Sequence, residues 1–194
     1  MNPFVRASSV ETQGRSVLEP FLLEKSDGRF VLFDKGPLAK ALQETSGDGV
    51  FSVKGDREYF VEIKTEQIHT GNLFLETWSN RNLSDRNNHA RLGSNPGWLH
   101  KQVADLLLYY FLDVDRLYVF DLFKLKRWAF VAPGKNGHPG RLWDYREAEQ
   151  NKHFQRNDTH GRIVPVADLV VEPGYRLLFV KQLVFDFGDE GLVA

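Results

Sequence analysis

Two short segments of alternating apolar and polar residues flank a turn signal in the first third of the chain. The segments span residues 49–54 and 58–64, and Gly55-Asp56 lies between them. This arrangement predicts two antiparallel strands joined by a tight hairpin. Because side chains alternate between the two faces of a strand, a slip of one residue would move every side chain to the other face. The hairpin therefore constrains the fold of this chain more than any other segment.

Only one register of this hairpin keeps its apolar side chains together. A three-residue loop, Lys54-Gly55-Asp56, is a common hairpin loop when it contains glycine. That loop puts five apolar side chains on one face: Phe51, Val53, Tyr59, Val61 and Ile63. A two-residue loop would instead mix apolar residues with Glu58 and Glu62, whose burial is costly. The three-residue loop is therefore favoured.

The favoured register gathers charged residues on the opposite face. Asp48 stands opposite Glu62, and Lys64 follows on the same face. Two neighbouring carboxylates suit Mg²⁺, which prefers oxygen ligands, and a bound metal activates water for attack on a phosphoryl group. A lysine beside them can orient that water and offset charge in the transition state. The competing interpretation is an exposed sheet face with interleaved charges and no catalytic role.

The rest of the chain alternates helical and extended patterns. Apolar spacing predicts a helix over residues 10–22, started by a capping box of Ser8 and Glu11 and interrupted or kinked at Pro20. Further strands are expected at 29–33, 73–78, 117–120, 163–166 and 176–180, and helices at 38–44, 98–111 and 122–128. This order predicts an α/β protein with a central mixed β-sheet flanked by helices. A length of 194 residues suits one domain, 1–194, with a C-terminal extension after about residue 169.

Composition excludes several functional classes. The chain has no cysteine, which rules out disulfides and zinc–thiolate sites. It has neither the roughly 20-residue apolar run of a membrane span nor the apolar segment of a signal peptide, so we expect a cytoplasmic protein without a membrane partner. No Walker-type loop and no Gly-x-Ser-x-Gly elbow is present. Because the net charge is −1, any contact with nucleic acid must come from a local patch.

Basic residues of the second half could form such a patch. The candidates lie on the helix predicted at 122–128 and in a polar segment after it: Lys124, Lys126, Arg127, Arg156 and Arg162. Lysine and arginine commonly contact the phosphate backbone. A solvated helix face gives the same pattern, so both interpretations stay open.

Two further features lie around the helix predicted at 98–111. Lys101 and Asp105 are four residues apart on it and form either an ordinary surface pair or a contact that supports the charged cluster. The segment 79–97 before it is long and polar, which is typical of a functional loop. We expect substrate selection there.

The charged cluster resembles the motif of the PD-(D/E)xK nuclease superfamily, in particular its small bacterial and phage members. Asp48 followed by Glu62-Ile63-Lys64 is similar to that motif, and Gly47 stands where the motif has proline. Residues 70–76 resemble the Thr-Gly-Asn strand of these members, and residues 101–105 resemble the helix that follows it. The resemblance covers roughly residues 9–169 and implies a restriction-endonuclease-like fold.

The resemblance also implies a function. Asp48, Glu62 and the backbone carbonyl of Ile63 would bind Mg²⁺ or Mn²⁺, and Lys64 would position the attacking water. The expected reaction is hydrolysis of phosphodiester bonds in DNA. Because many relatives are dimers, a homodimer is a further expectation.

Accessory residues and a rival interpretation complete the expectations. The resemblance adds Glu76 and Glu11 as accessory carboxylates, although Glu11 also fits the capping box. The rival interpretation is a catalytically inactive module on the same fold that binds nucleic acid or another protein. The near-neutral charge favours this rival, and the complete Asp, Glu and Lys set favours the nuclease.

Overall fold

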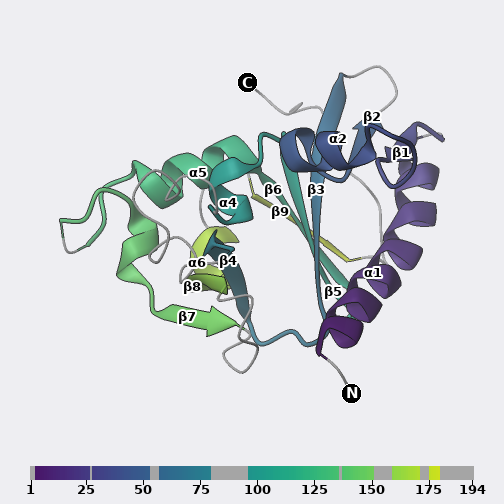
Figure 1. The fold of residues 1–194 in the computed structure, drawn as a ribbon. Helices are drawn as coiled ribbons and strands as arrows, with labels where there is room; N and C mark the ends of the chain where they lie inside the picture. The colour runs from purple at the N-terminus through teal and green to yellow at the C-terminus, as the bar shows by residue number, and fades with distance from the viewer. Residues whose placement is uncertain are drawn as a thin grey trace. The chain divides into compact units, whose positions relative to one another are not determined.

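The chain divides into two compact units. The computed structural model describes residues 3–26, 28–52, 57–79, 96–135, 137–150, 159–170 and 175–179, with the backbone alone at 3–8, 150 and 175–179. Unit 1 comprises Met1–Thr70, Val103–Leu122 and Glu172–Ala194, and unit 2 comprises Gly71–Gln102 and Phe123–Val171. Figure 1 shows their elements. That the whole chain forms one domain stays a prediction.

A six-stranded sheet forms the frame of unit 1, in the order β1-β2-β3-β5-β6-β9. Its strands are β1 (Phe30–Leu32), β2 (Gly49–Ser52), β3 (Glu58–Glu66), β5 (Leu106–Phe111), β6 (Arg116–Asp121) and β9 (Tyr175–Phe179). β3 and β5 run parallel, and the other neighbouring pairs of this sheet are antiparallel. The mixed sheet and its helices confirm the predicted α/β class.

The β2–β3 hairpin has the register that the apolar pattern predicts. Gly49 pairs with Val61 along the antiparallel ladder, which corresponds to the three-residue loop. The ladder ends at this pair: the Asp48 N–H donates to the Val61 carbonyl oxygen, so the predicted pairing of Asp48 with Glu62 is not part of the ladder. The apolar side chains of one face are buried: Phe51, Tyr59, Val61 and Ile63. Residues 53–56, which include the predicted loop, lie outside the described residues.

The helix α1 (Pro3–Lys25) packs on this apolar face. Three of its side chains join the core of the sheet: Leu18, Phe21 and Leu22. The predicted capping box of Ser8 and Glu11 is wrong, because the helix begins at Pro3, a residue favoured at the first helical position. It also continues through Pro20 without ending there. A second helix, α2 (Ala39–Ser46), precedes β2.

The long helix predicted at 98–111 is wrong. Only α4 (Trp98–Lys101) is helical, and Leu106–Phe111 is the strand β5. All six residues of β5 are buried, and β5 lies between β3 and β6 within the sheet. A short run that is apolar on both faces has no period, so its sequence pattern does not distinguish a buried strand from a buried helix.

Unit 2 is built on a three-stranded antiparallel sheet in the order β4-β8-β7. Its strands are β4 (Asn72–Trp78), β7 (Glu147–Gln150) and β8 (Thr159–Pro165), and its helices are α4, α5 (Leu122–Phe130), α6 (Val166–Val170) and a 3₁₀ turn at Arg141–Asp144. The strand predicted at 73–78 and the helix predicted at 122–128 are confirmed. Within the described residues, no helix has the length and apolar character needed to cross a membrane.

Candidate functional site

A glycine turn sets the position of Asp48 at the start of β2. Gly47 adopts a φ of +99°, which residues with a Cβ rarely adopt. A Cβ added there would lie 2.5 Å from the Val61 carbonyl oxygen, and the Asp48 N–H donates to the same oxygen at 2.7 Å. Proline fixes φ at about −65° and so does not fit this position. The glycine at residue 47 therefore has a structural cause.

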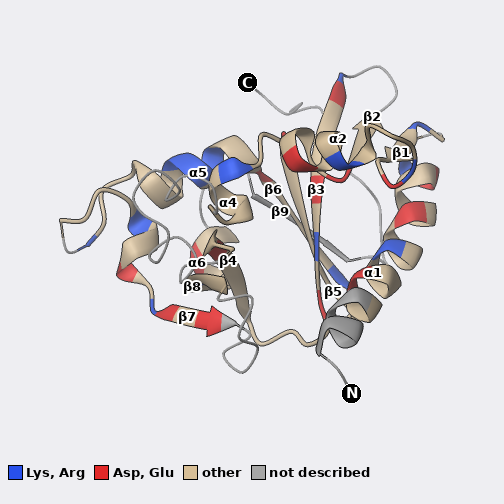
Figure 2. Cartoon of the chain, in the orientation of Figure 1, with Lys and Arg blue, Asp and Glu red and all other residues tan. Residues whose placement is uncertain are grey.

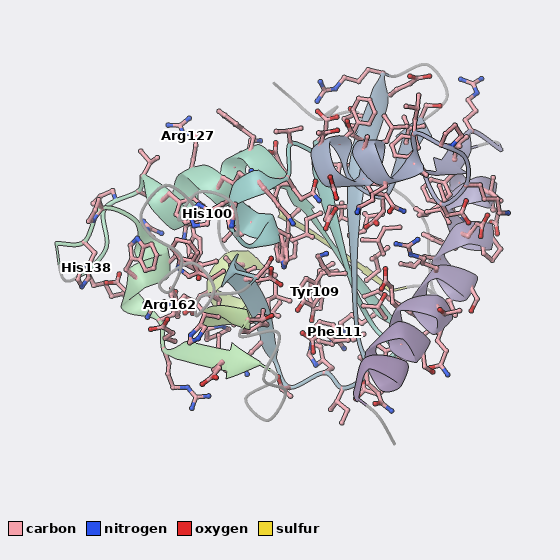
Figure 3. All side chains as sticks on the ribbon, in the orientation of Figure 1. His100, Tyr109, Phe111, Arg127, His138 and Arg162 are labelled. Atoms are coloured by element: carbon pink, nitrogen blue, oxygen red, sulfur yellow. The ribbon has the colours of Figure 1, made fainter. Side chains whose placement is uncertain are left out.

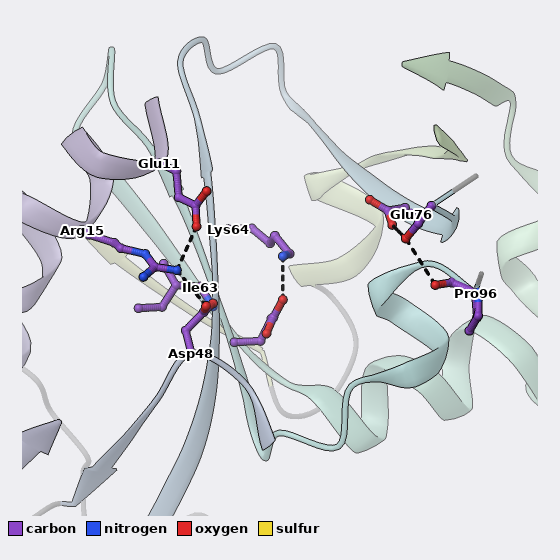
Figure 4. Close-up of polar contacts among 9 residues, drawn as sticks. Glu11, Arg15, Asp48, Ile63, Lys64, Glu76 and Pro96 are labelled. Atoms are coloured by element: carbon purple, nitrogen blue, oxygen red, sulfur yellow. Dashed lines mark hydrogen bonds and ion pairs between the residues drawn. The ribbon is translucent and has the colours of Figure 1, made fainter. Parts of the chain in front are cut away.

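The Asp48 carboxylate is buried and bound at both oxygens. Its Oδ2 accepts a hydrogen bond from the Ile63 N–H at 2.7 Å, and its Oδ1 accepts one from Arg15 Nη2 at 2.9 Å (Figure 4). In a strand, the N–H and C=O of one residue point to the same side. The Ile63 carbonyl therefore points to the edge of β3 where the Asp48 carboxylate lies, and two oxygen groups meet at that edge.

Glu62 and Lys64 form an ion pair on the face of β3 opposite its apolar residues. Lys64 Nζ lies 2.5 Å from Glu62 Oε1 (Figure 4). The Glu62 side chain is only 4% exposed, whereas that of Lys64 is 32% exposed. A buried carboxylate is destabilising without a cation partner, which Lys64 provides. Each of the two carboxylates, Asp48 and Glu62, is thus held by a cation.

Arg15 is a residue of this site that the sequence analysis missed. Its Nη2 atom lies 2.8 Å from Glu11 Oε1 and 2.9 Å from Asp48 Oδ1. The spacing of Glu11 and Arg15 along one helix face is visible in the sequence. The third partner is not, because Asp48 is 33 residues from Arg15. Glu11 is therefore linked to Asp48 through Arg15.

The oxygen donors of this region suit a hard divalent cation. The carboxylates of Asp48 and Glu62 and the carbonyl of Ile63 are groups that Mg²⁺ prefers, and Mg²⁺ commonly takes one or two carboxylates and completes its shell with water and phosphate. Within the described ranges, no cluster of three or more acidic, histidine or cysteine side chains is arranged to hold a metal. A metal here would therefore depend on two carboxylates, the backbone carbonyl and the substrate.

A further carboxylate follows Lys64 on the same face of β3. Tyr109 lies beside Lys64 across the β3–β5 ladder, and its hydroxyl donates to Glu66 Oε1 at 2.6 Å. Burial raises the pKa of the Glu66 carboxyl above its ordinary value of 4.5, and the hydrogen bond from Tyr109 acts in the opposite direction. Figure 3 shows Tyr109 and Phe111 on β5. Polar residues therefore continue along this face from Glu62 through Lys64 to Glu66.

Lys101 and Asp105 do not form the predicted helical pair. α4 ends at Lys101, which is exposed in unit 2, and Asp105 lies directly before β5 in unit 1. Asp105 Oδ2 accepts a hydrogen bond from the Phe60 N–H at 2.9 Å, and its Oδ1 lies 3.4 Å from Arg57 Nη2. Asp105 therefore fastens the start of β5 to β3.

Glu76 belongs to unit 2. It lies on β4, beside an irregularity in the β4–β8 register between Glu76 and Trp78. The Ser79 hydroxyl donates to Glu76 Oε1 at 2.6 Å and lies 3.3 Å from the Pro96 carbonyl oxygen (Figure 4). The accessory role of Glu76 stays a prediction.

The basic residues of α5 have different surroundings. Lys124, Lys126 and Arg127 make this helix the most continuous basic stretch in Figure 2. Lys126 Nζ donates to the backbone carbonyls of Gln102 and His100 at the end of α4, and burial lowers the pKa of its ammonium group. Arg127, in contrast, is exposed and projects away from the helix (Figure 3). Lys126 therefore serves the structure of unit 2, and Arg127 is accessible to a ligand.

Arg162 is also bound within unit 2. Its Nη1 donates to the Tyr145 carbonyl oxygen at 2.9 Å, and its guanidinium lies 5.1 Å from the centre of the Trp143 ring. An ion pair with Glu147 at 3.7 Å adds to these contacts. Arg156 lies outside the described residues. Contact of DNA with these basic residues stays a prediction.

No family model, curated protein or solved structure matches this chain. A function must therefore be assigned from the chain's own residues, chiefly those around Asp48, Glu62 and Lys64.

Proposed function

We propose that this protein is a metal-dependent nuclease that hydrolyses phosphodiester bonds in DNA. The observation that supports the proposal is the hydrogen bond from the Ile63 N–H to Asp48 Oδ2, which ties Asp48 to the residue between Glu62 and Lys64 on β3. This combination of two carboxylates and a lysine is the set that the sequence motif requires. The intervening Ile63 adds a backbone carbonyl on the side of Asp48.

The arrangement of unit 1 supports a restriction-endonuclease-like fold. A helix, α1, comes first and packs on the sheet, and β1, β2 and β3 follow as an antiparallel series. The chain then returns as β5, parallel to β3. The order up to β3 is the one that the resemblance implies before the motif. After the motif, the strand β5 stands in the place of the expected long helix.

The residues of the site have separate tasks in the proposed reaction. Asp48, Glu62 and the Ile63 carbonyl would hold Mg²⁺ or Mn²⁺, which lowers the pKa of water and polarises a phosphoryl oxygen. Lys64 holds Glu62 in place through its ion pair, and its ammonium group can donate to the attacking water or to a phosphate oxygen. Ile63 fixes Asp48 through its N–H.

A specific observation favours the second candidate, an inactive module on the same fold. Arg15 neutralises Asp48, so the carboxylate is stable without a metal. The net charge of −1 also gives the chain little general attraction for nucleic acid. Both candidates share the structure of unit 1 and differ in whether divalent metal binds there.

Cleavage of plasmid and branched DNA in Mg²⁺ or Mn²⁺ tests the proposal. The wild type should cut, and Lys64→Ala should lower the rate by about 100-fold or more, as expected for loss of a group that stabilises the transition state. Lys40→Ala is the matched control, because Lys40 is an 87% exposed lysine of α2. Equal rates for the wild type and Lys64→Ala would exclude Lys64 from the mechanism. No metal-dependent cleavage by the wild type would favour the inactive module.

A further inference from the structure

A single nitrogen of Arg15 lies between two carboxylates. Nη2 is 2.8 Å from Glu11 Oε1 and 2.9 Å from Asp48 Oδ1, as the dashed lines in Figure 4 show. Arg15 and Asp48 are largely enclosed, with side chains 22% and 12% exposed, whereas the Glu11 side chain is 58% exposed. The guanidinium is therefore a cation held against a sheltered carboxylate of the proposed metal site.

A divalent metal and Arg15 would meet at the same carboxylate of Asp48. Asp48 has two carboxylate oxygens, and Oδ2 already accepts the Ile63 N–H. Oδ1 is the oxygen bound by Arg15. A guanidinium does not lose its proton in proteins, so Arg15 keeps a positive charge at Oδ1 that repels a second cation. Glu11, one turn away on α1, offers Arg15 a second partner when metal binds.

We propose that Arg15 is a built-in counter-ion that competes with divalent metal for Asp48 and so sets the metal affinity of the site. The inference rests on the proposed function, since it concerns the same site. Without metal, Arg15 stabilises the buried Asp48 carboxylate. With metal, the ion pair between Arg15 and Asp48 breaks, and part of the binding free energy of the metal is used to break it. Removal of the positive charge should therefore strengthen metal binding.

Calorimetric titration of the full chain with Mn²⁺ alone tests this competition. Arg15→Gln should bind Mn²⁺ about tenfold more tightly than the wild type, a change of about 1.4 kcal/mol. Arg15→Lys keeps the charge but loses the planar fork, so its affinity should lie between the two. Asp48→Asn should abolish this binding. Lys25→Gln is the matched control and should bind like the wild type, because Lys25 also lies on α1 and pairs with an exposed glutamate, Glu24, at 3.0 Å.

The outcomes separate this inference from the proposed function. If the wild type binds Mn²⁺ through Asp48 and Arg15→Gln binds equally or more weakly, Arg15 does not compete and the inference is overturned, while the nuclease proposal stands. If neither protein binds Mn²⁺, both are overturned. Circular dichroism of each variant establishes folding. If Arg15→Gln does not fold, Arg15→Lys decides the question. An affinity of Arg15→Lys for Mn²⁺ at or below that of the wild type would show that Arg15 does not compete with the metal.

Discussion

Replacement of Gly14 by alanine tests how α1 delivers Arg15 to the site. Gly14 lies one residue before Arg15, where α1 packs directly on Thr65 of β3. A Cβ added at Gly14 would lie 2.0 Å from Thr65 Oγ1, 2.5 Å from its Cγ2 and 2.7 Å from its Cβ. The close approach of helix and strand therefore depends on the absence of a side chain at this position.

The magnitude follows from which of these atoms can move. Rotation of the Thr65 side chain moves Oγ1 and Cγ2 but not Cβ, so α1 and β3 must separate by about 0.3–0.7 Å to restore the tight contacts of a packed interior. Overpacking of this kind costs about 1–3 kcal/mol. Alanine regains about 1 kcal/mol of helix propensity. We expect Gly14→Ala to lower the free energy of unfolding by up to about 2 kcal/mol.

Urea unfolding followed by circular dichroism measures this change as a lower midpoint at constant slope. Ser16→Ala is the control, because Ser16 is exposed on the same helix and should change stability little. Thr65→Ala should reduce the cost of Gly14→Ala in a double-mutant cycle, since it removes the two nearest atoms. If Gly14→Ala instead raises the free energy of unfolding by the full gain in helix propensity, about 1 kcal/mol, the close packing of α1 on β3 is refuted, and with it the placement of Arg15 beside Asp48.

Two further predictions concern buried ionisable groups. The folded-state pKa of Glu66 is raised above 4.5, so the folded state binds this proton more tightly than the unfolded state does. The protonated Glu66 therefore stabilises the fold at acidic pH. This contribution is lost as the pH rises through the raised pKa. Glu66→Gln should therefore raise the melting temperature at pH 7 but not at pH 4, and equal effects at both values would contradict this pKa. Lys126→Met should destabilise the protein by about 1–3 kcal/mol in urea, because two carbonyls lose their donor. Arg127 is exposed on the same helix, so Arg127→Met should change stability little but weaken DNA binding. A larger loss of stability in Arg127→Met than in Lys126→Met would contradict the assigned roles.

The hairpin was predictable from the sequence, and the strand β5 was not. Along β3, apolar and charged residues alternate, so only one register buries the apolar set, and the structure has that register. Leu106–Phe111 is buried on both faces and has no such alternation. Its identity as a strand is decided by its neighbours β3 and β6, which lie far away in the sequence.

The site itself was predictable only in part. The motif pointed to Asp48 and to the Glu62–Lys64 pair, which lie close together in the sequence or across one hairpin. Arg15 was missed because the rotation of α1 about its axis, which aims Arg15 at Asp48, depends on the packing of the whole helix face against the sheet. The capping box failed for a similar reason: the local signal was present, but the helix started earlier, at Pro3.

Paramagnetic broadening by Mn²⁺ tests the central claim, a divalent metal site at the start of β2 and the middle of β3, most directly. Amide signals of the ¹⁵N-labelled protein are followed as Mn²⁺ is added below one equivalent. The amides of Gly49 and Ile63, next to Asp48 and Glu62 in the sequence, should broaden first, and Asp48→Asn should remove the effect. Unchanged signals at these two positions, or the same broadening in Asp48→Asn, would contradict a metal site there.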